Sequence, residues 1–330
     1  MDASPKVSVI VPVFNAGENL TASIESLLNQ SLKAIEIIIV NDASTDDTAL
    51  VVDQLARKNS NIITVHFTEN LGVHEARLAG LKKSTAPWIG FLDADDFARP
   101  NMFETLLASA ENSDVDIVVC GSDRVTFQRQ VIAPKLRFSR SEKVETNVFE
   151  RFCAFDFGTG VLWNKLFRRS VIEPWFDLHF PWRQSINEDL IFNIGCFYNA
   201  KSVYLCKERL HEYVLNQSSV TSSITKVEAY VNTYRAAALA ISLCSELGDD
   251  ALHRVIDLYR TQLSWSDYQV GSVSSFFEYD AELKEAVNLI SRVHPAALAL
   301  LTARQNQPLV GGKLAVKSLL HKGLTVLGLH

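Results

Sequence analysis

The first half of the chain alternates between short apolar runs and segments whose apolar residues recur every three or four positions. The apolar runs cover residues 7–14, 35–40, 62–67, 88–92 and 115–120. Helical spacing is found in the intervening segments, for example at Leu20, Ile24, Leu27 and Leu28. Runs that are apolar throughout are typical of strands covered on both faces. The alternation therefore predicts an α/β fold, with a mostly parallel sheet flanked by helices.

The last third has a different pattern, with helical spacing and few strand signals. Helices are expected at 227–246, 252–268 and 281–303, separated by glycine- or asparagine-containing breaks. We therefore predict two domains, residues 1–225 and residues 226–330, the second being helical. Residues 309–330 place apolar side chains on one side and Lys313, Lys317 and His321 on another. This basic amphipathic helix is expected either to lie on an anionic membrane surface or to dock on protein, including a second subunit.

Composition and charge narrow the class of protein. The 330 residues carry a formal charge of −6, which gives no general reason to expect a nucleic-acid partner. The five cysteines include no Cys-x-x-Cys pair, so we expect buried thiols in a reducing compartment. The amino terminus lacks the basic start of a signal peptide, and no apolar run is long enough to span a bilayer. These observations predict a cytoplasmic protein, with possible contact at the inner face of the membrane through 309–330.

Three carboxylates follow the apolar run at 88–92. Asp93, Asp95 and Asp96 lie at the carboxyl end of a predicted core strand, where they repel one another and lose water. Such hard oxygen ligands suit Mg²⁺ or Mn²⁺ shared with a substrate phosphate. The alternative is that they cap the next helix, a role that we expect for Asp96. In parallel sheets ligands bind at the carboxyl ends of strands, so Phe14, Asp42 and these acids are predicted to share one crevice.

Two common nucleotide-binding motifs are missing. The turn after the first predicted strand, 15–19, is Asn-Ala-Gly-Glu-Asn and lacks the Gly-x-Gly-x-x-Gly pattern of dinucleotide-binding domains. The chain also has no Gly-Lys-Ser/Thr loop. Nicotinamide-dependent and P-loop enzymes are therefore disfavoured.

Six ordered blocks resemble the family 2 glycosyltransferases of the GT-A fold, including bacterial enzymes that build surface polysaccharide. The blocks are VSVIVPVFN (7–15), VNDASTD (40–46), NLG with AR (70–72 and 76–77), DADD (93–96), WNKLFR (163–168) and NEDL (187–190). They span about two thirds of the chain. The resemblance implies a GT-A catalytic domain at 1–225 and a nucleotide-sugar donor, most often a UDP-sugar.

The resemblance also implies donor-binding roles for particular residues. Asp42 would accept a hydrogen bond from the uracil ring, since an acceptor-only carboxylate suits an imide N–H. The donor-binding set that it implies is Pro12, Phe14, Asp42, Arg77, Asp93 and Asp95. In this set Asp93 would touch the ribose, and Asp95 would ligate the Mn²⁺ or Mg²⁺ that bridges the two phosphates. The segment 210–221 contains no lysine or arginine, so phosphate contacts are expected from elsewhere.

On the acceptor side, the resemblance makes Asp189 the catalytic base. Inversion requires a base that faces the anomeric carbon opposite the leaving phosphate and takes the proton of the acceptor hydroxyl. Glu188 would orient the acceptor or Asp189, although acids at a helix start are also favoured by the helix dipole. Trp163 and Trp182 would offer flat faces to a sugar ring, but each could equally be a core residue.

These expectations predict an inverting, metal-dependent glycosyltransferase that moves a single sugar to a glycan or lipid-linked glycan acceptor. Two alternatives remain at this point. A nucleotidyltransferase could use a similar sheet and metal-binding acids, but would need a glycine-rich basic loop that 15–19 does not provide. A catalytically inactive sugar-nucleotide-binding protein would not need both Asp95 and Asp189. The possibility of a homo-oligomer is open.

Overall fold

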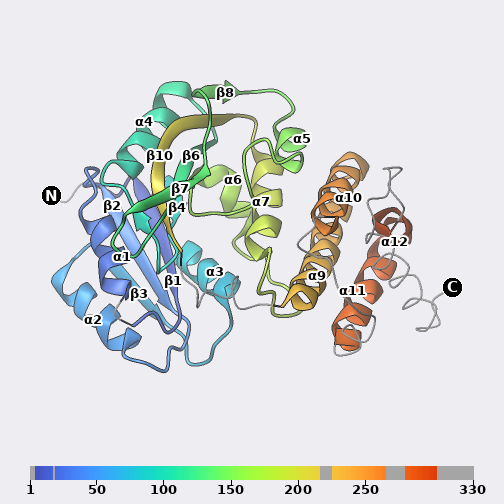
Figure 1. Cartoon of the computed structure of the whole chain (residues 1–330), viewed down its shortest axis with the longest axis horizontal. Helices are drawn as coiled ribbons and strands as arrows, with labels where there is room; N and C mark the ends of the chain where they lie inside the picture. Colours follow the sequence, from blue (N-terminus) through green and yellow to red (C-terminus); the bar gives the residue numbers. More distant parts are fainter. Residues whose placement is uncertain (1–3, 18, 216–224, 265–278, 303–330) are drawn as a thin grey trace. The chain divides into compact units, whose positions relative to one another are not determined.

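The computed structural model describes residues 4–17, 19–215, 225–264 and 279–302 (Figure 1). Contacts divide the chain into two compact units, residues 1–216 and 217–330. The predicted assignment of 1–225 to a catalytic domain and 226–330 to a helical domain remains a proposal. The predicted amphipathic helix at 309–330 lies outside the described residues.

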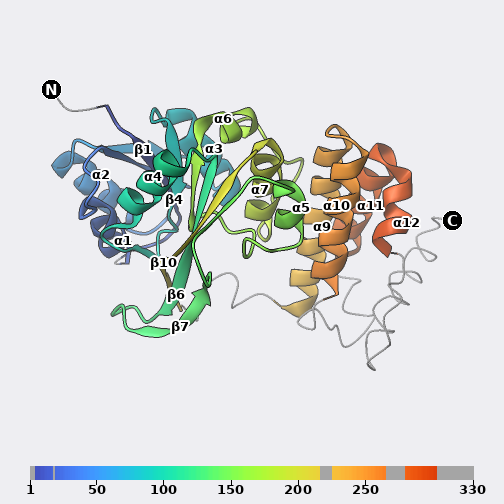
Figure 2. The ribbon, with the colours of Figure 1, turned by 90° about the horizontal axis from the view of Figure 1, so that it is seen from above.

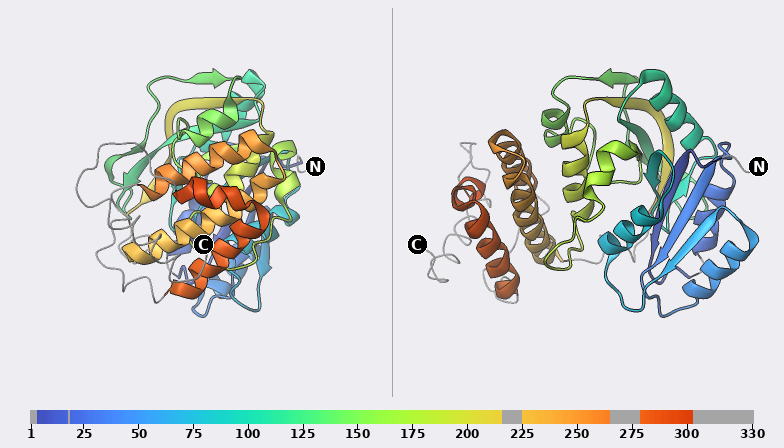
Figure 3. Two further views of the ribbon diagram at one scale, coloured as in Figure 1. Left: turned by 90° about the vertical axis from the view of Figure 1, so that its right-hand side faces the viewer. Right: turned by 180° about the vertical axis from the view of Figure 1, so that it is seen from behind.

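The first unit is built on a sheet that begins as predicted. Strands β1 (Val7–Val13), β2 (Ile35–Asn41), β3 (Ile62–His66) and β4 (Trp88–Phe91) are parallel, in the order β3-β2-β1-β4. The view from behind shows the blue strands β1 and β2 side by side (Figure 3). Their residues are nearly all buried, which explains the continuous apolar runs.

The rest of the sheet departs from a mostly parallel arrangement, so the sheet is mixed. Strand β9 (Lys165–Arg168) lies antiparallel between β4 and β6 (Ile117–Val125), and β6 then pairs in parallel with β10 (Val203–Val214). The remaining strands are β5 (Phe97–Ala98), β7 (Val131–Leu136) and β8 (Glu142–Val144), and each pairs antiparallel with β10 or β6. Figure 2 shows the hairpin of β6 and β7 extending from the sheet.

Helices cover both faces of the sheet, as predicted. On one face, alternate β1 residues such as Val9 and Val11 share a core with α1 (Asn19–Leu28), α2 (Thr48–Lys58) and α4 (Met102–Ser113). On the other face, α3 (Val73–Lys83) packs closely on β1 and β2. A Cβ on Gly80 would lie 2.6 Å from Ile10, which explains the glycine there.

Further helices follow β8. They are α5 (Val148–Cys153), α6 (Arg169–Ile172), the 3₁₀ helix η1 (Glu173–Trp175) and α7 (Glu188–Asn199), the last starting where it was predicted. All five cysteines of the chain are free and buried, which confirms that part of the prediction.

The second unit contains four described helices. They are α9 (Lys226–Ser245), α10 (Asp249–Leu263), α11 (Asp280–Val293) and α12 (Pro295–Thr302). The helix predicted at 281–303 is thus two helices, because Pro295 has no N–H to continue the first and pushes His294 out of helical conformation (φ −152°, ψ 83°). Within the described ranges, no helix has the length and apolar character needed to cross a membrane.

Candidate donor and catalytic site

Asp42 organises the loop that leads into α3. It directly follows β2 and is only 3% exposed. Its two carboxylate oxygens accept hydrogen bonds from the backbone N–H groups of Leu71 (2.7 Å) and Gly72 (2.8 Å), and its carbonyl accepts from Asn70. A carboxylate has about four acceptor positions. It therefore keeps the capacity for one further N–H, and its contact with a base remains a prediction.

The ends of β1 and β2 are tied together by loop hydrogen bonds. The N–H of Asn15 donates to the Ser44 hydroxyl, and the side-chain oxygen of Asn15 accepts from the N–H of Thr45. Phe14 precedes this turn with 49% of its surface exposed. Pro12 is buried within β1, where it pairs with Val40. Phe14 thus has an accessible ring at the strand edge, whereas Pro12 lies inside the sheet.

Arg77 links three elements that are far apart in the sequence. Its guanidinium donates to Glu188 at the start of α7 (Nη1 to Oε1, 2.8 Å) and to Asp93 after β4 (Nη2 to Oδ1, 3.3 Å). Burial alone would lower the pKa of Arg77, but Glu188 and Asp93 raise it above its ordinary value. The side chain is therefore a fixed cation that holds the predicted donor acid beside the helix that carries the predicted base.

Two carboxyl groups of the site, those of Asp95 and Asp189, have raised pKa values and therefore resist ionisation. Burial, together with the charges of Asp96 and Asp93, raises the pKa of Asp95 to about 7. Burial and the charge of Glu188 raise the pKa of Asp189 to about 7, while Arg77 opposes this shift. Strongly perturbed carboxyl groups gathered in one place are typical of functional sites. This excess of negative charge favours binding of a proton or a cation.

The carboxylates of this site suit a metal ion that is coordinated partly by the protein and partly by a bound ligand. Among the described residues, no group of three or more His, Cys, Asp or Glu side chains is placed to hold a metal by itself. Mg²⁺ and similar ions are commonly held by one or two carboxylates together with substrate phosphates and water. Asp95, with its destabilised negative charge, supplies the hard oxygen donors that such an ion needs.

Asp96 does not cap the next helix, contrary to the prediction. It is 1% exposed, and its Oδ1 accepts a hydrogen bond from the N–H of Val214 at 2.8 Å. Its Oδ2 lies 3.3 Å from Nε2 of His211. Burial lowers the pKa of His211 to about 3, so the imidazole is neutral. Asp96 thus binds β10 to the loop of residues 93–96, which we call the acidic loop. No spacing in the sequence indicates this contact between distant segments.

The two tryptophans differ in accessibility. Trp163 is 4% exposed, and its ring stacks on His211 with centroids 4.0 Å apart. This burial weighs against its predicted contact with a sugar. Trp182 is partly exposed and donates from Nε1 to the Gln184 side chain at 3.2 Å, in the loop that precedes α7. Its acceptor role remains a prediction.

Lys165, a buried lysine of the WNKLFR block, supports the turn beside Asp189. Lys165 is fully buried, and its ammonium donates to the carbonyls of Thr159 and Val161. Burial lowers its pKa to about 7. From α7, the Asn193 amide donates to the carbonyls of Gly160 (2.6 Å) and Asp189 (3.0 Å).

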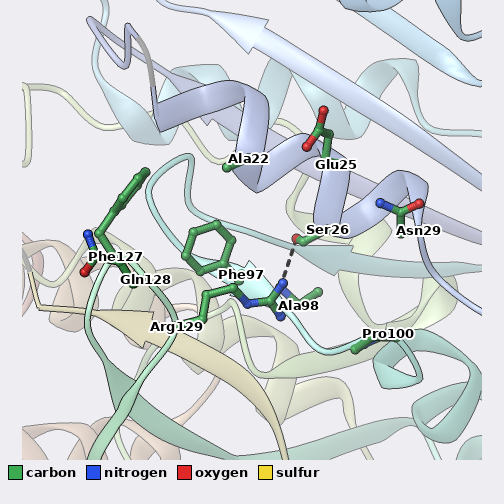
Figure 4. A pocket seen from close by; sticks show the side chains of 10 residues that line it. All are labelled: Ala22, Glu25, Ser26, Asn29, Phe97, Ala98, Pro100, Phe127, Gln128 and Arg129. Carbon is green, nitrogen blue, oxygen red and sulfur yellow. Dashed lines mark hydrogen bonds between the residues drawn. The ribbon is translucent and has the colours of Figure 1, made fainter.

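A separate surface pocket of about 270 Å³ lies between α1, β5 and the turn of the β6–β7 hairpin (Figure 4). Phe97, Phe127 and Arg129 line one part of it, and Glu25, Ser26 and Asn29 of α1 line another. The Ser26 hydroxyl accepts a hydrogen bond from the N–H of Ala98. Its lining residues do not include Asp42, Asp189 or the acids of the loop 93–96.

Comparison with known proteins identifies the family. The model of glycosyl transferase family 2 matches residues 8–176, more than half of the chain. The chain belongs to glycosyltransferase family 2. An uncharacterized glycosyltransferase, EpsJ of Bacillus subtilis, is 33% identical over 229 residues, which cover 66% of this chain and 63% of EpsJ. The match thus spans less than two thirds of that relative.

Solved structures confirm the GT-A fold of this glycosyltransferase. Staphylococcus aureus TarS 1-349 in complex with UDP-GlcNAc is 20% identical, with a TM-score of 0.68, and the match covers 89% of this chain and 83% of that one. The mannosyltransferase PcManGT of Pyrobaculum calidifontis, solved with GDP-Man and Mn²⁺, is 16% identical, with a TM-score of 0.51. That match covers 99% of this chain and 81% of PcManGT.

Proposed function

We propose that this glycosyltransferase moves a single sugar from a UDP-sugar to a hydroxyl of a glycan or lipid-linked glycan, with inversion and with Mn²⁺ or Mg²⁺. The observation that carries the proposal is the bridge made by Arg77. It holds Asp93, from the predicted donor and metal loop, beside Glu188, the neighbour of the predicted base. The fold therefore supports a reaction in which a metal-bound diphosphate and a base lie close together.

The donor would bind at the carboxyl ends of β1, β2 and β4. Asp42 keeps acceptor capacity for the imide of uracil, and the exposed ring of Phe14 is available to stack on it. Asp93 would accept from the ribose hydroxyls. UDP-GlcNAc is bound by the structurally similar TarS, which supports a UDP-sugar donor for this chain.

Asp95 would hold the metal ion. When bound, the ion would neutralise the charge that develops on the leaving diphosphate. The carboxyl group of Asp95, with its raised pKa, gains from such a neighbour because the cation offsets Asp93 and Asp96. PcManGT, a structural neighbour, was solved with Mn²⁺, which is consistent with a metal in this fold.

Asp189 would act as the base. As the bond between the anomeric carbon and the donor phosphate breaks, the acceptor oxygen forms a new bond to that carbon from the opposite side. The hydroxyl proton passes to the Asp189 carboxylate. A base with a pKa near 7 combines an ionised fraction at neutral pH with useful basicity. Glu188, fixed by Arg77, is assigned to orienting the acceptor or Asp189, and the accessible part of Trp182 to sugar contact.

The proposed acceptor is a glycan or a lipid-linked glycan. Resemblance to enzymes of surface polysaccharide synthesis favours a glycan built at the cytoplasmic side of a membrane. A lipid-linked acceptor would require the enzyme to reach that surface.

The test is release of UDP from UDP-glucose, UDP-galactose or UDP-N-acetylglucosamine with Mn²⁺, followed with and without glycan acceptors. We expect release with at least one donor, and its loss in Asp189→Asn while UDP binding is retained. Asp177→Asn is a matched control, because Asp177 is exposed and its ion pair is with Lys82, away from the acids of the site. UDP binding without any release would favour the inactive binding protein, and pyrophosphate release from nucleoside triphosphates would favour the nucleotidyltransferase.

A further inference from the structure

Two cations on the β6–β7 hairpin, Arg124 and Lys135, lie next to Tyr213 of β10. Arg124 of β6 is the register partner of Tyr213 on β10 and of Ala133 on β7. The β6–β7 register shifts by one residue at Lys135, because Pro134 pairs with Asp123 but Leu136 pairs with Ser122. Such bulges re-aim side chains and are frequent beside active sites.

The bulge directs Lys135 over two aromatic rings, those of Tyr213 and Trp163. Its Nζ lies 3.7 Å from the ring centroid of Tyr213 and 5.7 Å from that of Trp163. Cations are attracted to such ring faces. Tyr213 in turn lies within electrostatic range of Asp93, Asp95 and Asp96, whose charges, with burial, raise its pKa. The lysine therefore lies near the loop that carries Asp93, Asp95 and Asp96.

Neither cation has an anionic partner among the described residues. No carboxylate oxygen of the described chain lies within 4.0 Å of Lys135 or Arg124. The neighbouring arginines are different: Arg129 pairs with Glu212 and Arg209 pairs with Asp123. Moreover, Lys135 is partly buried next to Arg124, which repels it, while Asp96 attracts it. Because Lys135 is partly buried, its charge beside the exposed Arg124 is costly unless a ligand compensates it.

We propose that Lys135 and Arg124 form a phosphate-binding subsite beside the loop of residues 93–96. The inference rests on the proposed function and deepens it. The subsite supplies phosphate contacts that the segment 210–221, without lysine or arginine, does not provide. The phosphate comes either from the donor diphosphate or from the phosphate of a lipid-linked acceptor.

The test compares binding to wild type, Lys135→Gln, Arg124→Gln and the double variant by calorimetry with Mn²⁺ present. The probes are UDP against uridine for the donor, and farnesyl phosphate against farnesol for the acceptor. Arg137→Gln, an exposed residue next to β7, is the matched charge control. Loss of a charge-assisted contact to phosphate should weaken binding by about 10-fold or more. Uridine and farnesol binding should not change.

Weakened UDP binding assigns the subsite to the donor, and weakened farnesyl phosphate binding with unchanged UDP binding assigns it to the acceptor. If the double variant binds both phosphates like wild type, the subsite is refuted. Lys135→Arg keeps the charge and should retain binding, and Arg124→Gln alone suffices if Lys135→Gln does not fold. If wild type does not bind UDP, the proposed donor fails. Binding of inorganic pyrophosphate that depends on Lys135 would then still support the subsite, and its absence would refute it.

Discussion

Replacing Arg77 by methionine should destabilise the first unit and do so in a pH-dependent manner. Methionine replaces the aliphatic part of the arginine side chain but not its guanidinium, and it leaves Glu188 and Asp93 without their shared cation. Removing one partner of a buried ion pair costs about 3–5 kcal/mol, because a charge remains buried and uncompensated. The Arg77 and Glu188 side chains are each 9% exposed, whereas Asp93 is 33% exposed. Solvent screening at Asp93 therefore favours the lower part of that range.

The pH dependence follows from Asp189. Its pKa is about 7 in the folded state, against an ordinary value of 3.8, so ionising it costs stability above about pH 7 and this cost disappears as the pH falls towards 4. Arg77 opposes the upward shift, so without it the pKa rises further and the cost at pH 8 grows. The difference between wild type and variant should therefore shrink between pH 8 and pH 5.

Urea unfolding followed by tryptophan fluorescence measures this effect, since four of the five tryptophans lie in residues 1–216. Lys82→Met is the control, because Lys82 lies on the same helix in an exposed pair with Asp177. Its unfolding midpoint should stay near that of wild type. Arg77→Lys should have a lower free energy of unfolding than wild type, since the lysine ammonium lacks the planar guanidinium that reaches both carboxylates. A loss for Arg77→Met no larger than that of the control, or one independent of pH, would refute the reasoning.

Three further predictions concern the base and its support. Asp189→Asn should lower kcat by about 100-fold or more while the Kd for UDP changes less than about threefold, as measured by UDP release and calorimetry. The kcat/KM of wild type should rise with pH to a plateau above about pH 7, because the base must be ionised. A kcat/KM that falls through this pH range would contradict the role of Asp189 as the base. Gly160→Ala should cost about 1–3 kcal/mol in urea unfolding, since its Cβ would lie 2.5 Å from Leu190 Cδ1 and 2.9 Å from the Leu190 backbone.

The parallel strands and their helices could be predicted because their signals are local. Strands β1 and β2 are buried on both faces, so nearly every residue is apolar, and Asn15 and Asp42 after them mark the sheet edge. Strand β9 gave no such signal. It begins with Lys165 and follows Asn164, and both are buried only because loop and strand carbonyls accept their hydrogen bonds. That compensation exists only in the folded state.

The candidate site likewise contains residues whose positions the sequence indicates and contacts that it does not. The positions of Asp42, Asp93 and Asp189 were anticipated from strand ends and from family resemblance. The bond between Asp96 and β10, the stacking of Trp163 on His211, and the bulge that aims Lys135 all depend on register between distant strands. No periodicity in one segment encodes the register of another. The break between α11 and α12, by contrast, was available from Pro295 and was overlooked.

The central claim is that UDP binds at a metal held by Asp95. Calorimetric titration of UDP into wild type and Asp95→Ala, each with Mn²⁺ or with chelator, tests this directly. We predict binding to wild type that requires the metal and is lost in Asp95→Ala. Tight binding that is independent of metal and unchanged in the variant would contradict the claim.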